Sequence, residues 1–135
     1  MLGKYYKYAV LYPAILVMLG NIIACIFIAN EDFQSEWLTA DFIITLVIFM
    51  AFANAGIFCL LSATLFYNNQ PLVYGNPWYS ALAWMAAPGI YAGALLYKGH
   101  GDIFIIANTL PYLIALVVTF IHFRQNKNYM PPPIS

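Results

Sequence analysis

Residues 82–97 read LAWMAAPGIYAGALLY, a stretch without charge that contains one proline and two glycines four residues apart. It belongs to a longer window, residues 42–97, in which no residue is charged. The complete chain of 135 residues is 64% hydrophobic and only 7% charged, whereas soluble domains carry about 25% charged residues. Because so few charges cannot cover a soluble surface, we predict a single-domain integral membrane protein.

Four apolar windows are each long enough to cross a bilayer: residues 8–29, 40–67, 78–97 and 103–123. A helix crosses the hydrocarbon core with about 20 residues and satisfies its backbone hydrogen bonds within the segment. The apolar runs are continuous rather than alternating, which disfavours the strands of a membrane β-barrel. The sequence therefore predicts an all-α fold, an integral membrane four-helix bundle with up-down topology.

Polar connections separate these windows. Thr39 is placed to cap the second helix, and Asp41 falls in its first turn, where negative charge suits the helix dipole. Asn76 followed by Pro77 predicts an N-cap and a first-turn proline for the third helix. We expect residues 68–77 to form a neutral, water-facing loop, and residues 98–102, KGHGD, to form a tight turn.

The distribution of basic residues predicts the orientation. Only Lys98 lies between the third and fourth windows, whereas four basic residues flank the outer ends of the first and fourth windows: Lys4, Lys7, Arg124 and Lys127. By the positive-inside rule both termini are cytoplasmic, including a tail of residues 124–135. We expect a multi-pass protein of the cell membrane, namely the bacterial cytoplasmic membrane, surrounded by lipid. The balanced charge disfavours a nucleic-acid partner.

Cys25 leaves one alternative open for the first window. Residues 22–25, IIAC, follow two lysines and an apolar run, as in a lipoprotein cleavage site. The apolar run continues past Cys25 to Ile28, so an uncleaved helix is favoured over lipidation at Cys25. Cys25 and Cys59 lie at different predicted depths, which excludes a disulfide between them and indicates two free thiols.

Four polar residues fall at one level inside the predicted membrane segments. Counted from the cytoplasmic ends of their helices, they all lie at a depth of about 20 Å: Asn21, Asn54, Tyr91 and Asn108. We predict that they form a polar layer inside the bundle. Its members can bond to one another or to carbonyls that prolines release, which are that of Ala107 for Pro111 and that of Trp84 for Pro88. The layer has two interpretations, which are hydrogen bonding between helices or a site for a ligand or water.

Small residues predict where helices approach closely. Gly89 and Gly93 form a small-xxx-small pattern that Ala83 and Ala87 extend backwards. Such a face lets a second helix pack closely in lipid. We expect this contact mainly within the chain, although another copy or another membrane protein could supply the partner helix.

The absence of chemical motifs limits the function. No Asp, Glu, Lys or Arg lies deep within any window, which disfavours proton-coupled transport, pumping and voltage sensing. His100 and His122 are 22 residues apart, about 33 Å along a helix, so they cannot share a haem. A metal at His100 and Asp102 would have only two ligands on a turn. We therefore expect no metal, no cofactor and no catalytic residue.

The leading hypothesis is a non-enzymatic protein that acts by contact inside the membrane, as an accessory subunit or an immunity-type protein. The alternative is a small carrier or channel for a neutral or lipid-like molecule, which would use the Asn–Tyr layer. A dry, filled interior would favour the first hypothesis, and a cavity open to one leaflet or one aqueous face would favour the second. A membrane enzyme that uses His100 and Asp102 is the least supported.

Overall fold

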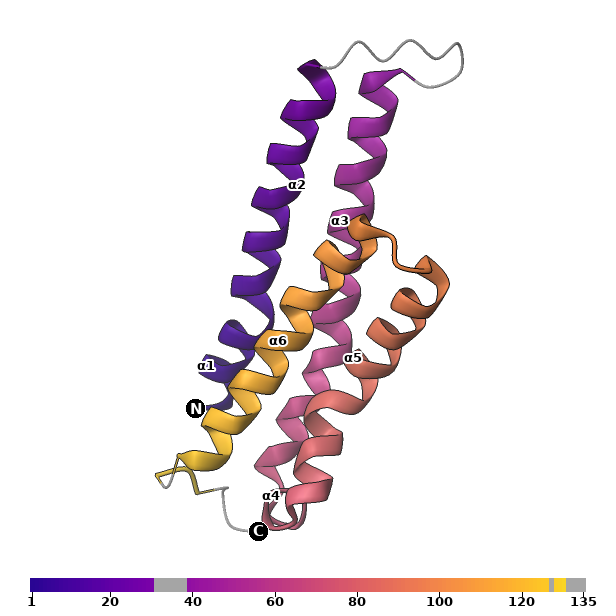
Figure 1. Ribbon diagram of the computed structural model, residues 1–135. Coiled ribbons are helices and arrows are strands. Elements are labelled where there is room, and N and C mark those ends of the chain that lie inside the picture. Colours follow the sequence, from indigo (N-terminus) through magenta and orange to yellow (C-terminus); the bar gives the residue numbers. More distant parts are fainter. Residues whose placement is uncertain (31–38, 127, 131–135) are drawn as a thin grey trace.

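The computed structural model describes residues 1–30, 39–126 and 128–130 (Figure 1). The described chain is helical throughout its regular elements and contains no strand. Four helices among these residues are long and apolar enough to cross a membrane: Leu2–Phe27, Asp41–Asn69, Pro77–Gly99 and Ile103–Gln125. The expected all-helical fold with four candidate membrane spans is therefore confirmed.

The first span consists of α1 (Leu2–Tyr6), a π-helical segment η1 (Lys7–Leu11) and α2 (Tyr12–Asn30). Within η1 the Tyr12 amide bonds to the Lys7 carbonyl five residues earlier. In an α-helix the Pro13 ring would clash with the carbonyl of Ala9, which favours this local widening. The helix begins six residues before the predicted residue 8, because Leu2 and Tyr5 are buried and hold this turn against the other helices.

The second span is α3 (Ala40–Ser62), which continues as a 3-10 helix, η2 (Ala63–Asn69). The Thr39 hydroxyl accepts a hydrogen bond from the Phe42 amide at 3.3 Å, and Asp41 lies in the first turn. Both predictions for this helix start are confirmed.

The remaining helices are α4 (Pro71–Gly75), α5 (Pro77–Gly99) and α6 (Ile103–Gln125). The Asn76 side chain accepts from the Trp78 amide at 2.9 Å, which confirms the predicted cap before Pro77. The turn between α5 and α6 is tight because His100 and Gly101 both have positive φ, 45° and 84°. Asp102 then caps α6 by accepting from the Phe104 amide at 2.8 Å.

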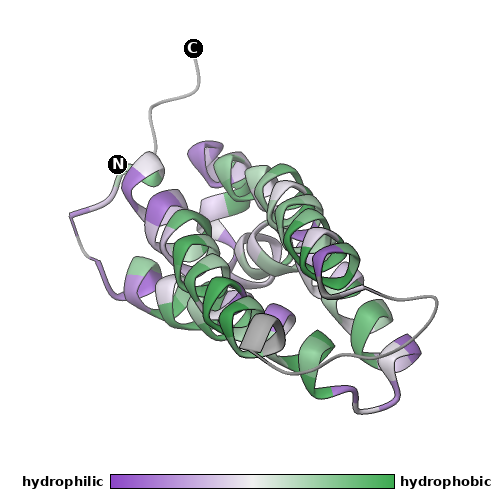
Figure 2. Cartoon of the chain, turned by 90° about the horizontal axis from the view of Figure 1, so that it is seen from above, coloured by the Kyte–Doolittle hydropathy of each residue, from purple (hydrophilic) through white to green (hydrophobic). Residues whose placement is uncertain are grey.

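The long helices lie side by side, and α2 and α3 extend past the α5–α6 turn (Figure 1). Hydrophobic residues make up most of each long helix (Figure 2). Many large apolar side chains are exposed, among them Ile26 on α2 and Phe49 on α3. We call the end that holds Lys4, Lys7 and Arg124 the basic end of the molecule.

Two clusters form the core. At the basic end the rings of Tyr5, Trp84 and Tyr129 surround Phe123, with centroids 5.3, 4.8 and 4.7 Å from it. Farther along the helices, a second cluster contains Val17, Phe58, Ala92 and Tyr112. Its central pair is a parallel stack of Phe58 on Tyr112, with centroids 4.3 Å apart. Aromatic stacking of this kind ties the four spans together.

The expected water-facing loop at residues 68–77 is wrong in one respect. Asn68 is completely buried, because its carbonyl accepts from the Tyr129 hydroxyl at 3.2 Å and its side chain bonds to the Ser80 hydroxyl. Arg124 donates to the Tyr74 carbonyl at 2.7 Å and lies over the Tyr74 ring. Burial, followed by the neighbouring Tyr74, raises the pKa of Tyr129 above its usual 10.0, so its hydroxyl stays a donor at neutral pH. The connection is thus folded onto the basic end.

Candidate functional site

The structure brings the four predicted polar residues into one chain of hydrogen bonds. The Tyr91 hydroxyl donates to Asn54 Oδ1 at 2.8 Å. Asn54 Nδ2 donates to the backbone carbonyl of Asn108 at 3.1 Å. Asn21 Nδ2 donates to Asn108 Oδ1 at 2.8 Å. The chain connects α5, α3, α6 and α2, so a polar residue on each long helix takes part.

Two asparagines of this network also bond to the backbone of their own helices. Asn21 Nδ2 also donates to the Val17 carbonyl, and Asn108 Nδ2 donates to the Phe104 carbonyl, both at 2.8 Å. Asn21 and Asn108 are buried. Besides these bonds among the four residues, Asn54 bonds to the backbone carbonyl of Asn108, whose second lone pair is available to it, and not to the neighbouring Ala107 carbonyl that Pro111 releases. The geometry is that of bonds between helices.

The expected internal contact at Gly89 and Gly93 is wrong. A Cβ atom added at either glycine would meet no other atom within 4 Å. The face of α5 that packs internally holds residues spaced by four: Ser80, Trp84, Pro88 and Ala92. This face is displaced by one residue, roughly 100° around the helix, from the glycine pair. Ala83 and Ala87 are half-buried and lie on the other side of the internally packed face from the glycine pair. The face with Trp84 packs internally because this large side chain fills the aromatic cluster at the basic end.

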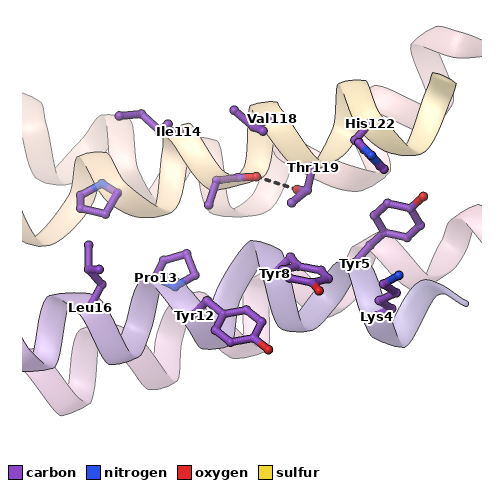
Figure 3. Close-up of a pocket in the computed structure, with 12 residues that line it drawn as sticks. Lys4, Tyr5, Tyr8, Tyr12, Pro13, Leu16, Ile114, Val118, Thr119 and His122 are labelled. Carbon is purple, nitrogen blue, oxygen red and sulfur yellow. Dashed lines mark hydrogen bonds between the residues drawn. The ribbon is translucent and has the colours of Figure 1, made fainter. Parts of the chain in front are cut away.

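A groove that the sequence analysis did not predict runs between the first span and α6 (Figure 3). Its volume is about 860 Å³. One wall comes from α1, η1 and α2, and the other from α6: Tyr8, Tyr12 and Leu16 face Ile114, Val118 and His122. Lys4, Tyr5 and His122 gather at one end of the groove. The large wall residues Tyr8, Tyr12, Leu16, Ile114 and Val118 are exposed, so the groove is open along its side.

Small side chains on α6 and a proline in each wall leave the space for this groove. Pro111, Ala115 and Thr119 follow one another at intervals of four and line the groove on α6. Pro13, in the first turn of α2, lines the groove from the other side. The Thr119 hydroxyl donates to the Ala115 carbonyl of its own helix at 2.6 Å, so it offers little polarity to the groove. The four-residue spacing of small residues on α6, opposite a proline, is the sequence signal that could have revealed the groove.

Contacts between the two walls mark the two ends of the groove, which stays open along its side. At the end away from Lys4, the bond between Asn21 and Asn108 draws α2 and α6 together. At the basic end, the Tyr5 ring packs against Phe123. Between these contacts the groove extends from Lys4 to Leu16, about 18 Å along the helix. This length is comparable with one leaflet, about half of the 30 Å hydrocarbon core.

The other candidate groups remain separate. Asp102 acts as the cap of α6, and no group of three or more His, Cys, Asp or Glu side chains in the described chain could hold a metal ion. Cys25 and Cys59 are free thiols, as predicted, and Cys25 lies within the continuous helix α2. The acidic side chains of Glu31, Asp32 and Glu36 and most of the proline-rich tail lie outside the described residues.

The chain was compared with known proteins at the level of family, sequence and structure. No protein-family model, no curated protein and no solved structure matches it.

Proposed function

We propose that the chain is a multi-pass protein of the bacterial cytoplasmic membrane that acts by contact with another membrane protein inside the bilayer. Its role would be that of an accessory subunit or an immunity-type protein, without a catalytic step or a cofactor. In this proposal the helices form an up-down bundle with both termini in the cytoplasm. The clustering of Lys4, Lys7 and Arg124 at one end of the molecule supports that orientation.

The observation that carries the proposal is the open glycine face of α5. Gly89 and Gly93 have no neighbour within 4 Å of a built Cβ, and large apolar residues such as Ile90 are exposed beside them. Small residues at this spacing let another helix approach closely in lipid. Since no helix in the described part of the chain uses this face, the proposed partner helix belongs to another protein or a second copy.

Cysteine crosslinking in native membranes tests this contact. The chain would carry Cys25→Ala and Cys59→Ala together with Gly93→Cys, and a short bifunctional thiol reagent would be added. The matched control is Gly56→Cys on α3, where a built Cβ also meets nothing within 4 Å. We expect crosslinked species from position 93 only, and mass spectrometry of the band distinguishes a second copy from another protein. Equal crosslinking at both positions, or none, would contradict the proposal.

A second candidate function, a carrier for a lipid-like molecule, is favoured by the groove between the first span and α6. The groove is open along its side, as a site entered from one leaflet would be. The Asn–Tyr layer does not line this groove, so a carrier would not use that layer as the sequence analysis expected. Lipid exchange between vesicles that contain the purified chain would test this function, with empty vesicles as the control.

A further inference from the structure

We infer that the groove between the first span and α6 is a binding site for an anionic phospholipid of the leaflet at the basic end. In this site Lys4 and His122 contact the phosphate, and an acyl chain lies along the groove toward Leu16. The inference is independent of the glycine face on α5 and of the partner proposed for it.

The polarity of the groove matches an amphiphile. Lys4 and His122 line its end at the basic end of the molecule, and no described lining residue is acidic. Apolar lining residues follow in the other direction, ending with Leu16 and Pro111. The Thr119 hydroxyl, which also lines the groove, already bonds to its own helix. The groove beyond Lys4 and His122 therefore suits hydrocarbon rather than a polar ligand. Basic pockets between membrane helices are typical sites for anionic headgroups.

Charge over the whole molecule supports the same occupant. Among the described residues the carboxylates are Asp41 and Asp102, and both lie at the opposite end from Lys4. A phosphate at the mouth of the groove therefore meets no nearby carboxylate of the described chain. In the orientation proposed above, this end faces the leaflet that carries most of the anionic lipid.

The dimensions favour a lipid chain over a helix of a partner protein. The bond between Asn21 and Asn108 draws α2 and α6 together before either helix ends, whereas a partner helix needs to continue through the full hydrocarbon core. One leaflet's acyl chain ends where the groove ends.

Tyr8 and Tyr12 form part of the groove wall on the first span. The rings of Tyr8 and Tyr12 stack at a centroid distance of 5.1 Å with an interplanar angle of 28°. Stacked rings lose little conformational freedom when a ligand arrives, and tyrosine hydroxyls suit the level just below the headgroups. The wall thus presents stacked apolar rings to an acyl chain.

Lipid titration followed by native mass spectrometry tests the site on the full chain in detergent. Phosphatidylglycerol and phosphatidylcholine with identical acyl chains would be added separately. We expect tighter binding of phosphatidylglycerol, and at least about a fivefold weaker binding after the double substitution Lys4→Gln and His122→Gln. Lys7→Gln is the matched control, because Lys7 is basic, lies at the same end and does not line the groove.

Substitutions that fill the groove provide a second, independent test of the site. Ala115→Leu places bulk on the groove surface, and Val118→Trp does so from an exposed wall position that can change without disturbing the core. Both variants should lower phosphatidylglycerol binding while circular dichroism stays unchanged. Equal binding of the two lipids, or an unchanged affinity in the Lys4/His122 variant, would overturn the inference. Displacement of the lipid by millimolar inorganic phosphate alone would also overturn it, because the site would then recognise the anion without the acyl chain.

Discussion

At the scale of single residues, the half-buried Tyr91 and the buried Tyr112 show how hydrogen bonding differs within one core. The Tyr91 hydroxyl donates to Asn54 at 2.8 Å, whereas the Tyr112 hydroxyl has no partner among the described residues. Both rings pack against Phe58, at centroid distances of 5.2 and 4.3 Å. A phenylalanine at either position keeps the ring contact and removes only the hydroxyl.

This pair gives a matched prediction for stability. Tyr91→Phe should lower the free energy of unfolding by about 1 kcal/mol, because it leaves Asn54 Oδ1 without its donor. Tyr112→Phe should leave stability unchanged or raise it, because the lost hydroxyl is buried without compensation. Reversible unfolding by dodecyl sulfate in mixed micelles measures both values. If Tyr112→Phe destabilises the chain as much as Tyr91→Phe, the assignment of hydrogen bonds is wrong.

At the scale of the elements, substitution by alanine should lower stability at one glycine of α5 and not at another. A Cβ atom at Gly99 would lie 2.7 Å from Ile105 Cδ1 and 3.3 Å from Ile105 Cβ, so Ile105 has to move. At Gly93 the same atom would meet nothing within 4 Å. Gly99→Ala should therefore destabilise the purified monomer by about 1 kcal/mol through overpacking, and Gly93→Ala should not. Thermal unfolding in detergent checks the difference, and equal melting temperatures for the two variants would count against the α5–α6 packing.

The π-helical segment allows a prediction about Pro13. If the proline causes the widening of residues 7–11, Pro13→Ala should let these residues relax to α geometry. That change rotates everything before residue 7 relative to α2, so Lys4 would leave the mouth of the groove. Electron paramagnetic resonance distances between labels at Lys4→Cys and His122→Cys should then increase, in a chain that also carries Cys25→Ala and Cys59→Ala. An unchanged distance would mean that burial of Leu2 and Tyr5, rather than Pro13, maintains the π geometry.

The helices themselves were predictable because lipid removes most alternatives. Long apolar windows have to become helices, and local signals such as Asn76–Pro77 mark their starts. The level of the four polar residues was also predictable, since the rise per residue is fixed. The packing face of α5 was not, because Gly89–Gly93 and Trp84–Pro88–Ala92 both run along the helix. Only the volume of the surrounding side chains decides between these faces. The groove escaped prediction for a similar reason, as it depends on what opposes Pro111, Ala115 and Thr119 across the interface.

At the scale of the whole molecule, the hydrogen-bonded layer sets the relative heights of the helices. Asn54 bonds to Asn108, so these two residues lie at one level. From that level α3 continues 14 residues to Ala40, whereas α6 continues only five to Ile103. At 1.5 Å per residue the start of α3 lies about 13 Å beyond the start of α6. Figure 1 shows the resulting overhang of α2 and α3.

This offset predicts a recessed turn between α5 and α6. Lys98, His100 and Asp102 lie at that turn, and these polar side chains need contact with water. Phe42 and Leu46, in contrast, are exposed apolar residues on the overhanging part of α3. The bilayer can cover the overhang only if the turn lies below the headgroup surface or the bilayer thins beside it. In intact cells a membrane-impermeant maleimide should label Asp41→Cys faster than Gly101→Cys, both in a background of Cys25→Ala and Cys59→Ala. Gly3→Cys should react only after the cells are opened, since the proposed orientation places it in the cytoplasm. Equal labelling rates at positions 41 and 101 would show that the turn reaches the same height as the start of α3, and the hydrogen-bonded layer would then not set the relative heights of the helices.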